Sequence, residues 1–288
     1  EMTLDVDKTK AKVEDLKSQS RLPKIAMFGG SVFLFPHPVK ELADFLKGHD
    51  MHVNYDAAHV AGLIAGGKFQ DPLREGTDTM TMSTHKTLFG PQGGLVLGFE
   101  KHAEPIKKAM FPGLTSSHHI HHMAAKAVAF AEAIEFGKDY ATQTIKNAKA
   151  LATELSNVGF KVLGEKSGYT ASHQTVVNVL DYGDGGGVEA DLEKANIIVN
   201  RQLIPGDLKA NRHYMHPGGI RLGTSEITRL GMKESEMKEV ASMIKDVVIN
   251  KKDPSEITPK VAEFRKEFQK TQYCFDNKVG AYEYVKLR

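Results

Sequence analysis

The sequence predicts an α/β fold, because short apolar runs alternate along the chain with amphipathic stretches that have the spacing of helices. The first run, KIAMFGG at 24–30, predicts a buried strand that ends in glycines. PVKELADFLKGHD at 38–50 predicts a helix, because its apolar residues recur on one helical face. The next run, MHVNYD at 51–56, predicts a second strand. Strands separated by helices are typical of parallel βαβ units.

Two more strands and one long helix complete the first half of the chain. TMTMS and GLVLGF predict a third and a fourth strand, and the glycines and proline of 90–94 predict a turn between them. A helical span with Ala-rich and acidic positions runs over about 121–158, and Gly159 is its expected stop.

The second half predicts a separate, smaller α/β domain. Its expected strands are KVLG, TVVNVLDY, NIIVN and GIRLGT, and its expected helices are VEADLEKA and ESEMKEVASMIKDVVI. The tail at 254–272, PSEITPKVAEFRKEFQKTQ, predicts another amphipathic helix. We expect a large domain over 1–150 and a small domain over 151–288, with a boundary near 145–155.

Composition limits the classes of function. The chain has 288 residues, of which 41% are hydrophobic and 26% charged, as in ordinary soluble globular proteins. Its 38 basic and 36 acidic residues leave a net charge of +2, so neither nucleic acid nor an anionic membrane is expected as a partner. No apolar run reaches the length of a membrane-spanning helix, and the start EMTLDVDKTK is unlike a signal peptide. The single Cys274 cannot form an internal disulfide, which predicts a cytoplasmic protein.

Two ionisable residues follow strands of the predicted sheet. Asp56 ends the strand MHVNYD, and Lys86 follows TMTMS within the segment TMSTHKTLFGPQGG. Because ligands bind at the carboxyl ends of parallel strands, we expect both side chains in one crevice. A lysine that forms a Schiff base and an aspartate that pairs with the pyridinium nitrogen are what pyridoxal phosphate requires. The alternatives are a helix N-cap for Asp56 and a surface lysine in a turn for Lys86.

Longer motifs make a family resemblance specific. YDAAHVAGLIAGG followed by TMSTHKTLFGPQGG resembles the serine hydroxymethyltransferase family, and the likeness continues through FPGLTSSHHIHHMAAKAVAFAEA, NAKALATEL, ANIIVN and GGIRLGTSEITRLG. The resemblance implies the fold of the type I pyridoxal-phosphate-dependent transferases, with a mostly parallel sheet in the large domain. It implies a glycine hydroxymethyltransferase of one-carbon metabolism, which converts serine and glycine and passes a one-carbon unit to tetrahydrofolate or a modified tetrahydropterin.

The resemblance also implies roles for single residues. Lys86 would be the Schiff-base lysine, Asp56 the partner of the pyridine nitrogen, and His59 a contact of the cofactor's phenolic oxygen. Ser83 and Thr84 would place hydroxyls close to the imine, and His85, just before the lysine, would help set substrate and reaction preference. Arg221, in GGIRLGT, would bind the α-carboxylate of the amino acid, a role that suits the bidentate guanidinium. Its alternative is a surface arginine at a strand end.

One segment is expected to act across a subunit boundary. FPGLTSSHH at 111–119 matches the family segment that reaches the cofactor phosphate of the neighbouring subunit, so Gly113 is an expected cofactor contact and a homodimer is predicted. The family has Gln-Gly-Gly where this chain has TSS at 115–117. The cluster HHIHH at 118–122 has a spacing compatible with zinc if helical, and His121 matches a histidine of the family. Since no carboxylate or cysteine completes a site, no metal is predicted.

Three departures concern the one-carbon carrier. Gln92 replaces an arginine in the glycine-rich segment, Gln202 stands where an asparagine commonly faces the pterin, and the segment 208–217 is longer than usual. Gln92 and Gln202 leave open an aldolase that cleaves β-hydroxy amino acids with pyridoxal phosphate but without a pterin.

The chain begins at Glu1 in a region that matches the middle of the family's large domain. The residue that stacks on the cofactor ring, part of the phosphate site and the groups proposed for proton transfer precede this region in the family. We therefore expect a fragment, a chain completed by another polypeptide, or a reduced relative. A further alternative is a non-catalytic fragment that binds no cofactor.

Overall fold

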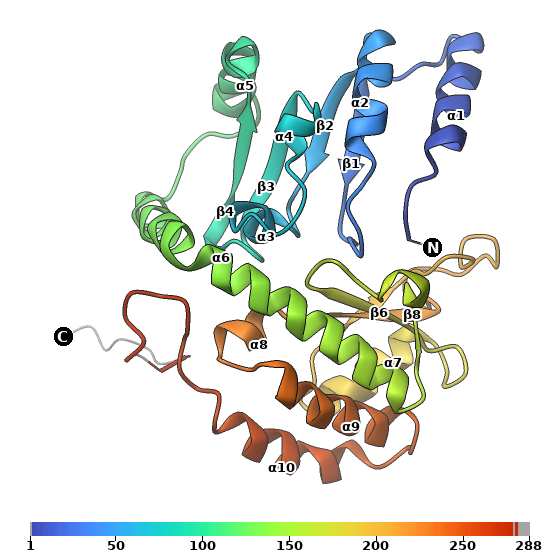
Figure 1. The fold of residues 1–288 in the computed structure, drawn as a ribbon, viewed down its shortest axis with the longest axis vertical. Helices are drawn as coiled ribbons and strands as arrows, with labels where there is room; N and C mark the ends of the chain where they lie inside the picture. Colours follow the sequence, from blue (N-terminus) through green and yellow to red (C-terminus); the bar gives the residue numbers. More distant parts are fainter. Residues whose placement is uncertain (1, 279, 282–288) are drawn as a thin grey trace. The chain divides into compact units, whose positions relative to one another are not determined.

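The computed structural model describes residues 2–278, 280 and 281 (Figure 1). The chain forms two compact units, an N-terminal unit of Thr3–Lys138 and a C-terminal unit of Asp139–Arg288 with the first two residues. The assignment of large and small domains to 1–150 and 151–288 stays a prediction. In the described part of the chain, no helix combines the length and the apolar character needed to cross a membrane.

The N-terminal unit is built around a four-stranded sheet in the order β1-β2-β3-β4, whose strands lie side by side in Figure 1. The first three strands are parallel and the fourth pairs with the third in the antiparallel sense. The strands are β1 (Ile25–Gly29), β2 (His52–Asp56), β3 (Thr79–His85) and β4 (Phe89–Gly98). The α/β class with a mostly parallel sheet is therefore confirmed.

Helices connect and flank these strands. The predicted helix at 38–50 is α2, Val39–Gly48, which buries its apolar stripe as the spacing requires. The other helical elements are α1 (Val6–Ser18), α3 (Ala61–Ala65), α4 (Pro72–Glu75), η1 (Glu100–His102), α5 (Ala103–Lys108) and η2 (Ala109–Leu114).

The register of the sheet separates a polar face from an apolar face. Asn54 pairs with Thr79 and Asp56 with Thr81, so these side chains project to the same side. The Asn54 side chain links the two strands on this face. Its Nδ2 atom donates to the Thr81 hydroxyl, and its Oδ1 atom accepts from the Thr79 hydroxyl. The opposite face carries the alternate residues, among them Tyr55 and the methionines of β3. The sheet thus presents polar side chains of β2 and β3 on one face and apolar side chains of the same strands on the other.

The predicted glycine turn at 90–94 is wrong, because these residues belong to β4. The strand begins at Phe89, Gly94 pairs with Ser83, and the register shifts between Ser83 and His85. Glycine is required at position 90 by a close approach rather than by a turn, since a Cβ there would lie 2.8 Å from the Thr84 carbonyl oxygen. Residues 86–88 form the turn between β3 and β4.

The long helix α6, Ile120–Asn157, confirms the helical span predicted over about 121–158. Gly159 follows its end with a φ of +110°, a left-handed conformation that stops a helix and favours glycine. The residues of α6 before Asp139 belong to the N-terminal unit, and the others to the C-terminal unit.

The C-terminal unit contains a second four-stranded sheet, antiparallel throughout, in the order β5-β6-β8-β7. Its strands are β5 (Lys161–Val162), β6 (Gln174–Asn178), β7 (Asn200–Gln202) and β8 (Gly219–Gly223). Its further helical elements are η3 (Glu165–Ser167), α7 (Gly185–Lys194), α8 (Ser225–Arg229), η4 (Glu234–Glu236), α9 (Met237–Val248) and α10 (Pro254–Arg265).

Two predicted elements of this unit are displaced. The strand expected at 196–200 begins only at Asn200, because Asn196 has a φ of +61° and the Ile197 amide bonds back to Leu192, which closes the end of α7. The tail helix expected over 254–272 ends at Arg265.

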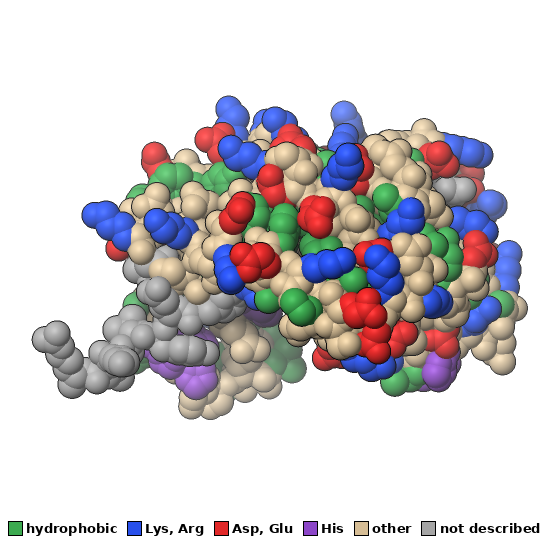
Figure 2. Space-filling view, turned by 90° about the horizontal axis from the view of Figure 1, so that it is seen from below, with side chains coloured by type: hydrophobic (Ala, Val, Ile, Leu, Met, Phe, Trp, Pro, Cys, Tyr) green, Lys and Arg blue, Asp and Glu red, His purple; other side chains and the backbone are tan. Residues whose placement is uncertain are grey.

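Charges are mixed on the molecular surface. Figure 2 shows basic and acidic side chains interspersed over the face in view, without a large area of one sign. This distribution agrees with the net charge of +2.

Candidate active site

The carboxyl ends of β1, β2 and β3 bring the predicted ionisable residues to one edge of the sheet. Asp56 is the last residue of β2, and Lys86 directly follows β3. Parallel pairing of these strands places both residues at the edge where α/β proteins bind ligands. Ser31 follows β1 at the same edge and has an exposed side chain. Sequence reasoning missed this hydroxyl, although its position after the strand KIAMFGG could have indicated it.

Lys86 contacts a histidine from the loop between β2 and α3. Its Nζ atom lies 3.3 Å from the Nε2 atom of His59, and the lysine side chain is exposed. Lys86 is thus exposed, as expected for a surface lysine in a turn, but it also contacts the titratable side chain of His59. An amine beside an imidazole can exchange a proton with it.

Thr87 ties the two loops of this contact together. Its hydroxyl donates to the His59 carbonyl oxygen at 2.9 Å and accepts from the Gly62 amide at 3.0 Å, and its side chain is buried. Gly62 allows this approach, since a Cβ there would lie 2.0 Å from the Thr87 carbonyl oxygen. Sequence reasoning missed Thr87, whose only signal is a hydroxyl next to the candidate lysine.

Asp56 is not the N-cap of a helix. Its carboxylate accepts a hydrogen bond from the Ala58 amide at 3.0 Å, whereas α3 begins at Ala61 with Val60 at its N-cap. The side chain is half-buried, and its strand is held by a bond of 2.7 Å from the Ala57 amide to the Thr81 carbonyl oxygen. The helix-cap alternative is therefore wrong.

The hydroxyls of Ser83 and Thr84 face opposite sides of β3. Ser83 is half-buried on the polar face, whereas Thr84 is fully buried and donates to the Pro91 carbonyl oxygen at 2.7 Å. His85 is exposed, and its Nδ1 atom accepts from the Gly93 amide at 3.3 Å. The structure thus brings Ser83 and His85 to the face and edge of Asp56, but it directs Thr84 to the other side.

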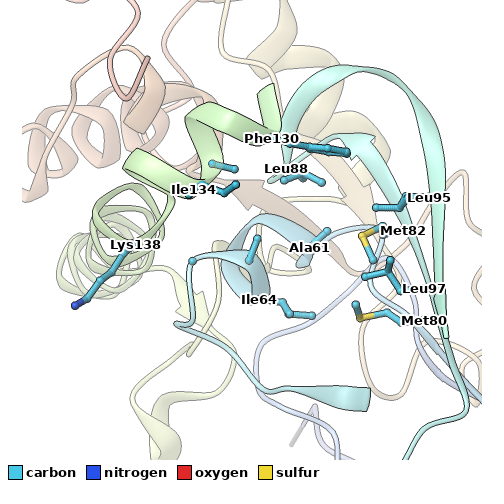
Figure 3. Close-up of a pocket in the computed structure, with 13 residues that line it drawn as sticks. Ala61, Ile64, Met80, Met82, Leu88, Leu95, Leu97, Phe130, Ile134 and Lys138 are labelled. Atoms are coloured by element: carbon cyan, nitrogen blue, oxygen red, sulfur yellow. The ribbon is translucent and has the colours of Figure 1, made fainter. Parts of the chain in front are cut away.

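The apolar face of the sheet forms a pocket of about 520 Å³ (Figure 3). Figure 3 shows side chains of β3, β4, α3 and α6 around it, and among the described residues that line it Lys138 alone carries a charge. The apolar lining residues labelled there are Ala61, Ile64, Met80, Met82, Leu88, Leu95, Leu97, Phe130 and Ile134. Apart from Lys138, the described lining is apolar, so we place the candidate chemistry on the polar face, where Asp56, Lys86 and His59 lie.

Histidines gather at the start of α6. The rings of His121 and His122 have centroids 4.4 Å apart, and the ring of His119 lies 5.4 Å and 5.2 Å from them. Desolvation and the neighbouring His121, His119 and Lys126 lower the pKa of His122. Within the described residues, no group of three or more His, Cys, Asp and Glu side chains is arranged to hold a metal ion. Gly113 lies just before this helix, exposed within η2, and its contact with a cofactor stays a prediction.

Arg221 lies on β8 of the C-terminal unit. Its guanidinium donates to the Asn200 side-chain oxygen at 2.9 Å, and the two residues pair across β7 and β8. The neighbours Ile220 and Leu222 point into the hydrophobic core, so Arg221 projects from the opposite face. Burial lowers the pKa of the Arg221 guanidinium, although Tyr214 acts against this shift. A half-buried arginine with a fixed orientation is suited to bind a carboxylate.

Comparisons with known proteins agree on one family. A family model described as serine hydroxymethyltransferase matches residues 1–244. The chain is 78% identical over 288 residues to a serine hydroxymethyltransferase of Nitrosopumilus maritimus strain SCM1, covering 100% of this chain and 66% of the relative. It is 51% identical over 284 residues to a serine hydroxymethyltransferase of Korarchaeum cryptofilum strain OPF8, covering 98% of this chain and 64% of the relative. The chain therefore spans about two thirds of the length of the curated relatives it matches.

A solved structure has the same fold. The crystal structure of L-threonine transaldolase from Pseudomonas fluorescens in the internal aldimine state superposes with a TM-score of 0.83 at 33% sequence identity. The match covers 96% of this chain and 61% of the transaldolase chain. The predicted fold class, that of the type I pyridoxal-phosphate-dependent enzymes, is confirmed.

Proposed function

Because the chain belongs to the serine hydroxymethyltransferase family, we propose that it is part of a pyridoxal-phosphate-dependent enzyme that interconverts serine and glycine. In this reaction the one-carbon unit passes to a tetrahydropterin, either tetrahydrofolate or a modified form. The observation that carries the proposal is the approach of Lys86 to His59 at the sheet edge that Asp56 ends.

The donor set at this edge fits pyridoxal phosphate. Lys86 offers an exposed amine for the aldehyde, Asp56 a carboxylate for the ring nitrogen, and His59 an imidazole for the ring oxygen. Ser83 and His85 add a hydroxyl and a second imidazole on the same side of β3. When bound, the cofactor supplies a ring that takes up the electron pair released as a bond to Cα breaks.

The residues of the chain then have separate tasks. Lys86 must lose a proton before its amine can react, and the imidazole of His59 is within reach to receive it. The Asp56 carboxylate stabilises a proton on the ring nitrogen, because opposite charges favour the charged form of the ring. Arg221 is proposed to bind the α-carboxylate of serine or glycine, with Asn200 holding the guanidinium in place.

Several finer features belong to the same proposal. Gln92 and Gln202 support a carrier other than ordinary tetrahydrofolate, since both replace residues usual in the family. The segment 111–119, with Gly113, is proposed to approach the active site of a neighbouring subunit in a homodimer, and the enzyme is proposed to be cytoplasmic. The role of Thr84 near the imine is supported only by the motif, because its hydroxyl bonds to the Pro91 carbonyl oxygen instead.

A second candidate function is cleavage of β-hydroxy amino acids without a pterin. The observation that favours it is the likeness to an L-threonine transaldolase at 33% identity over 96% of the chain. Both candidates use the same lysine and the same sheet edge, so they differ only in the acceptor of the released carbon unit.

The test starts from the purified chain and pyridoxal phosphate. Borohydride reduction is expected to attach the cofactor to Lys86, as read by peptide mass spectrometry, and Lys86→Arg is expected to abolish the attachment. Lys138→Arg is the matched control, because Lys138 lines the apolar pocket instead. Attachment to a peptide without Lys86 would contradict the assignment.

A second measurement separates the candidate functions. Serine cleavage that depends on a tetrahydropterin supports the transferase, whereas cleavage of threonine without a pterin supports the aldolase. A full-length protein that shows no visible cofactor band supports neither, and it agrees with a non-catalytic role.

A further inference from the structure

The loop that follows β1 folds back on the end of that strand, where the His37 ring contacts the backbone of Gly29. The Gly29 amide donates to the Nδ1 atom of this ring at 3.1 Å. Nδ1 must therefore be unprotonated, because a protonated nitrogen cannot accept a hydrogen bond. The turn begins with φ angles of +94° at Gly29 and +143° at Gly30, which glycine adopts without steric cost.

The backbone of His37 is held from both sides by Gln70, a residue 33 positions away. Gln70 Oε1 accepts from the His37 amide at 2.8 Å, and Gln70 Nε2 donates to the His37 carbonyl oxygen at 3.0 Å. The Gln70 side chain makes two more hydrogen bonds. Its Oε1 atom accepts from the Tyr55 hydroxyl at 2.7 Å, and its Nε2 atom donates to the Glu75 carboxylate at 2.6 Å. A flipped amide would oppose the bonds to the His37 amide, the His37 carbonyl oxygen and the Glu75 carboxylate, so these three partners determine the orientation of Gln70.

Aromatic packing holds the ring itself. The centroid of His37 lies 4.8 Å from that of Phe33 and 6.4 Å from that of Tyr55, which is fully buried. Burial lowers the pKa of His37, which favours the neutral form that the Gly29 bond needs. β2 carries the titratable groups His52, Tyr55 and Asp56, and α4 carries Arg74 and Glu75.

This unit adjoins the candidate cofactor site. Gly29 pairs with Asp56 across β1 and β2. A Cβ on Gly29 would lie 2.2 Å from the Asp56 carbonyl oxygen and 2.9 Å from the ring of Phe33. A movement of the turn would therefore press on the backbone of the residue proposed to bind the ring nitrogen.

We propose that His37 is a positioning residue, which in its neutral form, held by Gln70, sets the place of Gly29 and hence of Asp56. Its effect on the cofactor rests on the proposed function, but its effect on Gly29 does not. Protonation of His37 removes the acceptor at Nδ1, so the turn is released at acid pH. Gly29 is then no longer held in place beside Asp56, its partner across β1 and β2.

Two substitutions at position 37 separate the hydrogen bond from the bulk of the ring. His37→Asn keeps an acceptor close to the place of Nδ1, whereas His37→Leu removes it. In the chain without cofactor, the hydrogen-exchange protection of the Gly29 amide is expected to fall by about tenfold in His37→Leu, the effect of one lost hydrogen bond, and to persist in His37→Asn. The parent is expected to lose this protection below the lowered pKa of His37, and His37→Asn is expected to keep it.

Cofactor titration then tests the consequence for Asp56. Pyridoxal phosphate affinity, followed by absorbance, is expected to drop in His37→Leu and to recover in His37→Asn. If Gly29 responds as expected but no variant binds the cofactor, the proposed function is wrong and the positioning role stands. Equal Gly29 protection in all three proteins would overturn the positioning role.

A measurement on the parent keeps the proposal testable if His37→Leu does not fold. Nitrogen-15 NMR of the His37 ring at neutral pH is expected to show an unprotonated Nδ1 that accepts a hydrogen bond. A protonated Nδ1 would overturn the proposal without any variant.

Discussion

The Nζ atom of Lys86 lies 3.3 Å from the Nε2 atom of His59, a residue 27 positions earlier in the chain. The contact exists because β2 and β3 are parallel neighbours, so the loops that follow them meet at one edge. Thr87 holds those loops together through two hydrogen bonds of its hydroxyl. Replacement of single residues at this junction should therefore have separable effects on folding and on binding.

Thr87→Val is expected to destabilise the N-terminal unit by about 1–3 kcal/mol, because it leaves the His59 carbonyl oxygen and the Gly62 amide without their buried partner. Urea unfolding gives the free energy of unfolding. Thr87→Ser is the control, since it keeps the hydroxyl, and it should retain most of the stability. Equal stability of the Val variant and the parent would show that water replaces the hydroxyl.

Gly62→Ala is expected to destabilise the fold by about 1–3 kcal/mol through overpacking, because the new Cβ would lie 2.0 Å from the Thr87 carbonyl oxygen. Gly48→Ala, at the end of α2, is the matched control, because among the described residues only adjacent residues and the nearby helix backbone could lie within 4 Å of its Cβ position. The control should be neutral or slightly stabilising, since alanine favours helix. Thermal unfolding of both variants decides the prediction, which fails if they behave alike.

Arg221→Lys is expected to weaken serine binding by about 1–3 kcal/mol, because a lysine keeps the charge but loses the planar fork that binds a carboxylate bidentately. Cofactor affinity should barely change. Titration of the cofactor-loaded enzyme with serine measures the effect, and Arg265→Lys at the end of α10 is the control. If serine binds the Arg221 variant as tightly as the parent, another residue binds the carboxylate.

The buried Asp78 predicts a loss of stability in acid. Burial alone would raise the pKa of Asp78, but the hydrogen bond from the Val53 amide and the charges of Lys47, His52 and Lys101 together hold it below its ordinary value of 3.8. Because the pKa of Asp78 is lower in the folded state than in the unfolded chain, its carboxylate stabilises the fold at pH values above the ordinary pKa. This contribution is lost as the pH falls through the lowered pKa of the folded state.

Unfolding free energies of the parent and of Asp78→Asn, measured between neutral pH and the acid limit, test this expectation. The variant should lack the part of the acid-induced decline that Asp78 causes. Asp44→Asn, on the exposed side of α2, controls for the removal of a negative charge. Parallel pH profiles for the parent and Asp78→Asn would contradict the prediction.

Local pattern was sufficient to place the elements that carry the site. The alternation of TMTMS and the apolar run before Asp56 predicted β3 and β2, and residues at the carboxyl ends of parallel strands must meet. The helix α6 was predictable almost to its ends because its composition and the left-handed Gly159 are local signals. Residue chemistry alone also identified Lys86 and Asp56 as a pair.

Long-range packing decided the rest. Glycines at 90–94 have the local signature of a turn, yet their lack of side chains serves the close approach of β4 to β3. The direction of the Thr84 hydroxyl follows from strand register, which places alternate residues on opposite faces. The bonds of His37 to Gly29 and Gln70 join residues 8 and 33 positions apart. Such contacts have no periodic signal, because they depend on how buried polar groups find partners once the strands are in place.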